Sequence, residues 1–173
     1  MSLTTPFLGR YIWGATMGFS ELIWGVKASF RNYVEAVGGS INLSDGATRT
    51  ADGCFVFTAI PGGDLAIAAD GSATGAMGFQ GTITFDAHGG MLKATLTDLR
   101  LEVGVDGFFL TAMEAPMNQG RCTIAKLGPV THCPNAGITM DAEITLDGMY
   151  QLADNYPPGT TLDPLRLTPL KQD

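Results

Sequence analysis

The chain has 173 residues, which suits one domain with a single core, and 45% of them are hydrophobic while 16% are charged. A formal net charge of −7 disfavours nucleic acid as a partner, because phosphate backbones would be repelled. The 23 glycines are too many for a helical bundle and are typical of short strands joined by tight turns. Composition therefore predicts a soluble, β-rich protein.

The cysteines and the N-terminus indicate a cytoplasmic setting. Cys54, Cys122 and Cys133 are odd in number and form no CxxC pair, so we expect reduced thiols rather than a disulfide framework. Residues 1–19 are an aromatic and glycine-rich lead-in without the basic and continuous apolar regions of a signal peptide. No run approaches the roughly 18 to 20 apolar residues of a membrane-spanning helix. The initiating Met also favours a cytoplasmic protein.

The first predicted elements lie at residues 20–37. Residues 20–26 are either a strand or the first turn of a helix, and 27–37 form a short amphipathic helix that ends at a glycine pair. At about 100° per residue, an apolar stripe would face the core and polar side chains would point away. The stripe comprises Val26, Phe30, Val34 and Val37, and the side chains pointing away are those of Arg31, Asn32 and Glu35.

After residue 40 the apolar period changes to two, which is typical of half-buried strands. We expect the stretch 116–135 to be irregular. The proline-rich segment 156–173 is predicted to be an extended edge, because proline cannot donate a hydrogen bond to a sheet ladder. The clearest alternation has its apolar positions at Leu92, Ala94, Leu96, Leu99 and Leu101. The predicted strands span residues 41–43, 54–60, 75–87, 91–103, 107–115 and 138–146.

One helix among several strands predicts a mainly β fold, since a parallel α/β sheet would need helices between the strands. We expect an antiparallel β-sandwich or partly open barrel with one short α-helix at about 27–37. No repeat, low-complexity segment or interdomain linker divides the chain. Residues 1–173 are therefore predicted to form a single domain, with 1–19 as a lead-in and 156–173 as an extended C-terminal segment.

Two separated segments resemble the HtaA domain family. The segment 78–103, GFQGTITFDAHGGMLKATLTDLRLEV, places His88-Gly89 where the family keeps a histidine. The resemblance covers residues 22–103 well, the C-terminal tail in part, and 104–155 weakly. The other segment, LIWGVKASFRNYVEAVGGSINLSDGATR at 22–49, carries Trp24, Gly25, Val26, Lys27, Ser29, Phe30 and Tyr33 in the family pattern.

HtaA domains are haem-binding modules of mostly β fold in bacterial haem-uptake systems, so the resemblance implies haem as a cofactor. It implies that Tyr33 is the axial ligand of the haem iron, that His88 hydrogen-bonds this tyrosine, and that Ser29 contacts a haem propionate. The chemistry is consistent, because a phenol has a pKa of about 10 and binds ferric iron as phenolate. An imidazole that takes the proton would favour that form. Ser29 and Tyr33 would lie one turn apart on the same helix face.

A second hypothesis gives the same pocket to a cofactor-independent enzyme. Tyr33 and His88 in contact would form a general acid/base pair, and a cleft sized for a flat macrocycle would accept an aromatic or lignin-type biaryl molecule. Such a lyase or isomerase would, for example, release formaldehyde, with Lys27, Arg31 or Tyr11 binding the substrate. The chain has no Walker A loop, GxSxG or HExxH motif, so nucleotide binding and the common hydrolase mechanisms have no support.

A third hypothesis is a β domain that retains the family scaffold without binding a ligand. Under the other two, the partner is haem or a small apolar or aromatic molecule, and neither nucleic acid nor a membrane is expected. An exposed strand edge or apolar patch would also allow a homo-oligomer. The sequence leaves open the role of residues 104–135 and of the three cysteines.

Overall fold

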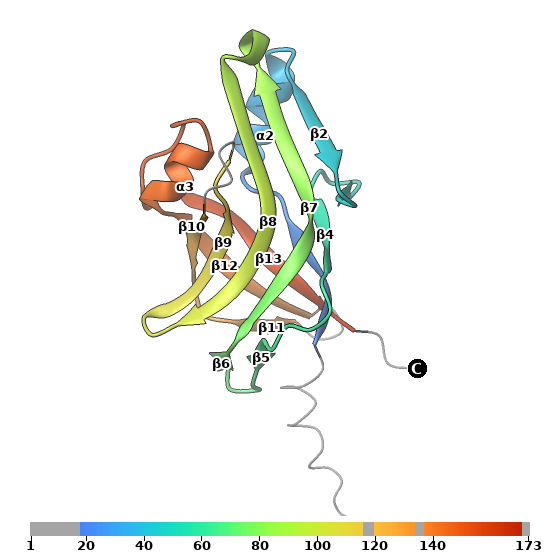
Figure 1. Cartoon of the computed structure of the whole chain (residues 1–173), viewed down its shortest axis with the longest axis vertical. Coiled ribbons are helices and arrows are strands. Elements are labelled where there is room, and N and C mark those ends of the chain that lie inside the picture. Colours follow the sequence, from blue (N-terminus) through green and yellow to red (C-terminus); the bar gives the residue numbers. More distant parts are fainter. Residues whose placement is uncertain (1–17, 116–119, 134–136, 171–173) are drawn as a thin grey trace, which may run out of the picture.

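The computed structural model describes residues 18–115, 120–133 and 137–170. Its main feature is an antiparallel sheet of eight strands that closes on itself into a barrel-like ring (Figure 1). Pairing of β4 with β7, where Thr58 lies opposite Gln80, closes the ring. In order around it, the strands are β7 (Ala76–Ala87), β8 (Leu92–Gly104), β9 (Gly107–Met113), β10 (Arg121–Leu127), β12 (Gly137–Ile144), β13 (Thr161–Pro169), β1 (Phe19–Trp24) and β4 (Phe55–Ala59).

Short strands add to this ring. One of them, β2, pairs with the half of β7 that leads to the β7–β8 turn, while β3 pairs with β4, β11 pairs with β12, and β5 and β6 form a small separate sheet. The prediction of a mainly β, antiparallel fold is confirmed, and the sheet is barrel-like rather than a sandwich. The added strands are β2 (Ser40–Ser44), β3 (Thr48–Arg49), β5 (Ala66–Ile67), β6 (Ala73–Thr74) and β11 (Thr131–Cys133).

The interior of the ring is filled by side chains, as an eight-stranded barrel requires. The alternation on β8 skips one residue between Leu96 and Leu99, where Asp98 has a φ of 54° and the register with β7 shifts at the same level. The five apolar positions predicted on this strand are all buried. The largest side chains of the interior include Trp24, Phe55, Phe57, Phe79 and Phe85.

The predicted helix is present as α2 (Ala28–Ala36), and residues 20–26 form the strand before it rather than its first turn. Phe30 and Val34 are buried, as the apolar stripe predicts. Val37 lies just beyond the last helical residue and is 40% exposed, so it does not extend the stripe into the core. Phe30 and Val34 are therefore the apolar side chains by which α2 packs into the core.

The prediction that residues 116–135 are irregular was wrong, because β10 lies there between β9 and β12. A β-bulge hides this strand in the sequence. The register with β9 shifts between Thr123 and Ala125, and Ile124 and Ala125 are both buried. Two successive inward side chains break the alternation by which a strand is recognised.

A second helix, α3 (Leu146–Gln151), was not predicted. Its six residues are too few to show a helical period, but it begins at a capping residue. The Thr145 hydroxyl accepts a hydrogen bond of 3.0 Å from the Gly148 N–H, which satisfies one of the free donors in the first turn. Among the described residues, no helix has the length and hydropathy that crossing a membrane requires.

The prediction of an extended edge at the C-terminus was also wrong, because β13 pairs with β12 on one side and with β1 on the other. Pro164, in the interior of β13, is tolerated for a local reason. Pro164 lies where the register between β12 and β13 shifts, so no ladder donor is lost from a regular pair. Leu165 and Leu167 after it are fully buried.

The three cysteines, Cys54, Cys122 and Cys133, are free thiols of intermediate exposure. Burial raises the pKa of the Cys54 and Cys122 thiols, and the nearby carboxylates of Asp52 and Asp147, respectively, raise these pKa values further. Both thiols therefore stay protonated at neutral pH, and a protonated thiol is a poor nucleophile.

Replacing Thr145 by alanine tests the cap of α3. We expect Thr145→Ala to lower the free energy of unfolding by about 1 kcal/mol, because an N-cap hydroxyl contributes roughly 0.5 to 2 kcal/mol. Urea unfolding followed by circular dichroism measures this. The control is Thr131→Ala, an exposed position on the short strand β11, which should stay within about 0.5 kcal/mol of the parent. Equal effects of the two substitutions would contradict the capping role.

Candidate functional site

Tyr33 and His88 lie in direct contact. The Tyr33 Oη atom is 2.7 Å from His88 Nε2, and the two ring centroids are 5.8 Å apart with planes inclined by 56°. Tyr33 comes from α2, and His88 begins η1 (His88–Gly90), the turn between β7 and β8 at the top of Figure 1. The fold thus joins two side chains that are 55 residues apart in the sequence.

An aromatic contact in the core also holds α2 against β7. Phe30 packs against Phe85 of β7 with ring centroids 4.8 Å apart, and both rings are buried. Phe30 lies three residues before Tyr33, and both are on α2. Phe85 of β7 lies three residues before His88, the first residue of η1. The apolar contact in the core therefore joins α2 to β7, and the polar contact at the surface joins α2 to the turn that directly follows β7.

The turn η1 places the imidazole by its backbone conformation. His88, Gly89 and Gly90 have φ values of 54°, 66° and 94°, so three successive residues lie in the left-handed region. Two glycines adopt this region readily, and histidine is among the residues that tolerate it. A Cβ on either glycine would meet no atom within 4 Å, so both glycines lie in open space.

The pair lies at the surface. Tyr33 is 43% exposed and His88 is also exposed, while Val34, the next residue on the helix, is fully buried. A phenol whose hydroxyl is accessible and contacts an imidazole can pass its proton to that imidazole or share it. It can also present its oxygen to a ligand from outside.

Ser29 and Lys27 lie beside Tyr156, which follows α3. The Ser29 Oγ atom is 3.4 Å from the Tyr156 hydroxyl, and the Lys27 ammonium lies 5.4 Å from the centre of the Tyr156 ring. Lys27 Nζ also donates a hydrogen bond of 2.9 Å to the Thr161 carbonyl. Tyr156 was not singled out in the sequence, where it stands in a proline-rich segment without any motif.

Arg31 is placed differently from its prediction. It was expected to point away from the core with the polar face of the helix, but it is buried, and its Nη1 lies 2.8 Å from Asp163 Oδ2. The physical reason is this ion pair, because a buried guanidinium needs a partner. The predicted role of Arg31 in substrate binding stays a prediction, and Tyr11 lies outside the described residues.

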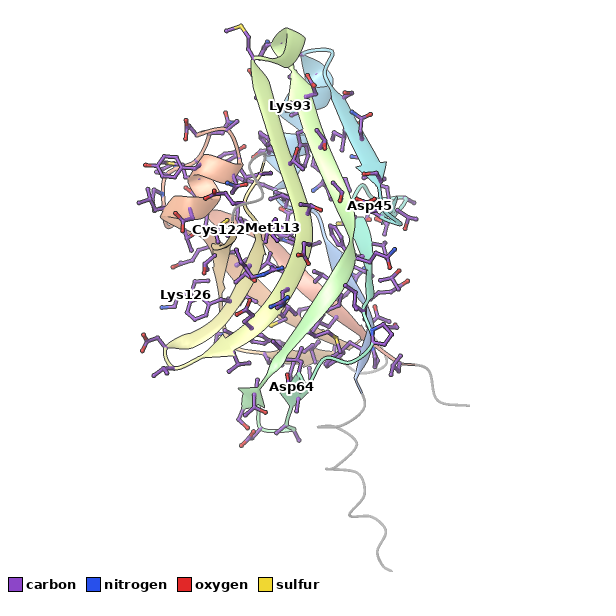
Figure 2. All side chains as sticks on the ribbon, in the orientation of Figure 1. Asp45, Asp64, Lys93, Met113, Cys122 and Lys126 are labelled. Carbon is purple, nitrogen blue, oxygen red and sulfur yellow. The ribbon has the colours of Figure 1, made fainter. Side chains whose placement is uncertain are left out.

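A recess of about 340 Å³ opens between β8 and α3. Lys93, which lines this recess, lies near the start of β8, just after η1 (Figure 2). Large apolar side chains exposed elsewhere include Val37 after α2, Met91 after η1 and Leu146 on α3, and Tyr150 of α3 is exposed at the recess itself. The recess is lined by Lys93, Ala94, Thr95, Ala115, Tyr150 and Gln151.

Solved structures of similar fold include three domains from one organism. The C-terminal domain of HtaA from Corynebacterium glutamicum is 28% identical with a TM-score of 0.64, and the match covers 88% of this chain and 97% of that chain. Its N-terminal domain is 23% identical with a TM-score of 0.65, covering 90% and 99%. The heme binding protein HtaB from the same organism is 18% identical with a TM-score of 0.60, covering 88% and 93%.

The sequence itself identifies the family. A search of curated proteins gives no match. The family model HtaA, described as Htaa, matches residues 20–168. This range includes all eight strands of the closed ring apart from Phe19, the first residue of β1, and Pro169, the last residue of β13. Because this match spans far more than half of its length, the chain belongs to the HtaA family.

Proposed function

We propose that this protein binds haem, with Tyr33 as an oxygen ligand of the iron and His88 as the hydrogen-bond partner of that tyrosine. The 2.7 Å contact between Tyr33 Oη and His88 Nε2 carries the proposal. Membership of the HtaA family supports it. The solved structure of HtaB, which is named as a heme binding protein, has the same fold.

The donor set fits the cofactor. Tyrosine is one of the side chains that hold haem iron in proteins, and the exposed Tyr33 hydroxyl is accessible to a ligand. His88 Nε2 can take the phenol proton, and a protonated imidazole then donates a hydrogen bond to the phenolate oxygen. A partner of this kind orients a metal ligand and raises its basicity.

The surroundings suit a ligand with a flat apolar face and acidic groups. The exposed side chain of Met91, directly after the turn that carries His88, would lose contact with water under such a ligand, which is favourable. Ser29 would contact a propionate through its exposed hydroxyl, and Lys27 would add positive charge beside it. Bound haem would supply a redox-active iron centre, which the amino-acid side chains alone lack. A cytoplasmic location and a homo-oligomer stay predictions from the sequence.

Replacing Tyr33 by phenylalanine tests the ligand. In a titration of the purified protein with hemin, we expect the parent to give a saturable spectrum with the charge-transfer band of tyrosinate-bound ferric haem. Tyr33→Phe should lose that band, because the oxygen donor is gone, while its far-ultraviolet circular dichroism stays unchanged. The matched control is Tyr150→Phe, which removes another exposed phenol hydroxyl and should retain the band.

Either of two results would contradict the haem proposal. One is a titration without saturation in the parent protein. The other is the same charge-transfer band in Tyr33→Phe and in the parent. If the parent titration does not saturate, the hypothesis of an acid/base enzyme is tested next. Aromatic substrates are then screened for a product that the parent forms and that both Tyr33→Phe and His88→Ala fail to form.

Replacing His88 by alanine tests the partner of the ligand. Without an imidazole to take the proton, the tyrosinate form of the complex should require a more alkaline solution. We expect the charge-transfer band of His88→Ala to reach half its full intensity at a higher pH than in the parent. Affinity for hemin at neutral pH should fall roughly 10- to 100-fold, as is typical when the hydrogen-bond partner of a metal ligand is removed. A pH titration of the hemin complex that superimposes on that of the parent would rule out this role.

A further inference from the structure

We propose that Asp163 and Arg31 are positioning residues for the Tyr33–His88 pair. Together they hold the start of α2 against β13, and so determine where Tyr33 lies relative to the β7–β8 turn. The inference deepens the proposed function and rests on it for the importance of the pair. The hydrogen bond between Tyr33 and His88, whose geometry this ion pair would determine, forms in the protein without a ligand.

The helix α2 has little support of its own. It has nine residues, its N-cap residue Lys27 makes no side-chain capping bond, and its first turn contains no acidic residue. Isolated helices of this length are marginal in water, so tertiary contacts must hold it. Because Tyr33 and His88 are both exposed, packing around their rings does not fix their separation.

Asp163 supplies the missing cap from a distant strand. Its Oδ1 accepts a hydrogen bond of 3.0 Å from the Ala28 N–H at the first residue of α2, and its Oδ2 pairs with Arg31 at 2.8 Å. Its backbone N–H donates to the Val26 carbonyl at 2.9 Å, and its backbone carbonyl accepts from Trp24 Nε1 at 2.7 Å. One residue of β13 therefore holds four residues of the segment that leads from β1 into α2.

The segment needs this support because its backbone is strained. Val26, between β1 and α2, has a φ of 64° and is fully buried. A β-branched residue in the left-handed region is an outlier that persists only where the surroundings enforce it. The hydrogen bond from the Asp163 N–H to the Val26 carbonyl is one of the contacts that enforce it.

Arg31 fixes the rotation of the helix. Its side chain is only 9% exposed, and its Nη1 also donates a hydrogen bond of 2.7 Å to the Gly25 carbonyl. A Cβ on Gly25 would collide with both the Arg31 guanidinium and the Asp163 carboxylate, so glycine is required there to make room. Any rotation of α2 that separated Arg31 from Asp163 would leave a buried charge without its partner.

Small rotations matter at the site. Arg31 and Tyr33 are two residues apart, which places them on nearly opposite sides of the helix. A rotation of about 10° moves an atom at the outer helix radius of about 5 to 6 Å by roughly 1 Å. Such a displacement breaks a hydrogen bond of 2.7 Å, since the useful range ends at about 3.2 Å.

The test uses the two histidines of the full chain, without haem. Imidazole nitrogens of the ¹⁵N-labelled protein are observed by NMR at about pH 8, where histidine is ordinarily neutral. Tyr33→Phe defines the His88 Nε2 chemical shift without the hydrogen bond. We expect Asp163→Asn and Arg31→Lys each to move this signal at least half of the way to that value. The His132 signals, from β11, should stay in place in all variants.

The chain offers two matched controls. Asp98→Asn makes the same substitution in another Arg–Asp pair, in which Arg121 Nη2 lies 2.7 Å from Asp98 Oδ2. Glu35→Gln removes the exposed pair with Arg49 on α2 itself. Exposed ion pairs contribute little. Neither control should move the His88 Nε2 signal measurably.

Three results would overturn the inference. One is an unchanged His88 Nε2 signal in folded Asp163→Asn and Arg31→Lys. Another is an equal shift in Asp98→Asn, which would indicate general loosening of the barrel. The third is loss of native amide dispersion in both variants, which would make the ion pair a requirement of the fold rather than a positioning device. Since no haem is added, failure of the hemin titration and failure of this test are distinguishable.

Discussion

The contact between Phe30 and Phe85 inside the barrel is the interaction on which the site depends. It joins α2 to β7, and each ring lies three residues before one member of the Tyr33–His88 pair. Eight strands enclose just enough space for side chains, and aromatic rings fill much of that space here. Tyr33 and His88 lie outside this packed interior, at the surface. The barrel supplies a rigid reference, and the elements at its end carry the side chains that can react.

Regular parts of the fold could be predicted from the sequence, and irregular parts could not. The strand β8 and the helix α2 show clear apolar periods, and both lie within two residues of their predicted bounds. A bulge interrupts β10, and a register shift accommodates Pro164 in β13. Both features remove the local signals by which a strand is recognised. Closure of the sheet also requires a strand between β12 and β1, and the proline-rich C-terminal segment supplies it as β13.

The site was predictable only in part, for a similar reason. Spacing alone gives no reason to pair Tyr33 with His88, and it was the family resemblance that indicated the pair before its geometry was known. Arg31 was misplaced because its partner Asp163 is 132 residues away, and an amphipathic period carries no information about such a partner. Tyr156 likewise reaches Ser29 across 127 residues. Long-range contacts of this kind become visible only once the ring is assembled.

The left-handed turn that carries His88 has a consequence for how this scaffold can diversify. The turn packs against nothing around its two glycines, whereas Tyr33 belongs to a helix anchored in the core. Position 88 therefore accepts substitution without disturbing the core, but only by residues that tolerate a positive φ, and the other half of the site is held in place by folding. A mutation at position 88 changes the chemical partner offered to the tyrosine while the ladder between β7 and β8 stays intact. The range of partners that this scaffold can offer Tyr33 is thus limited by the backbone of a single hairpin tip.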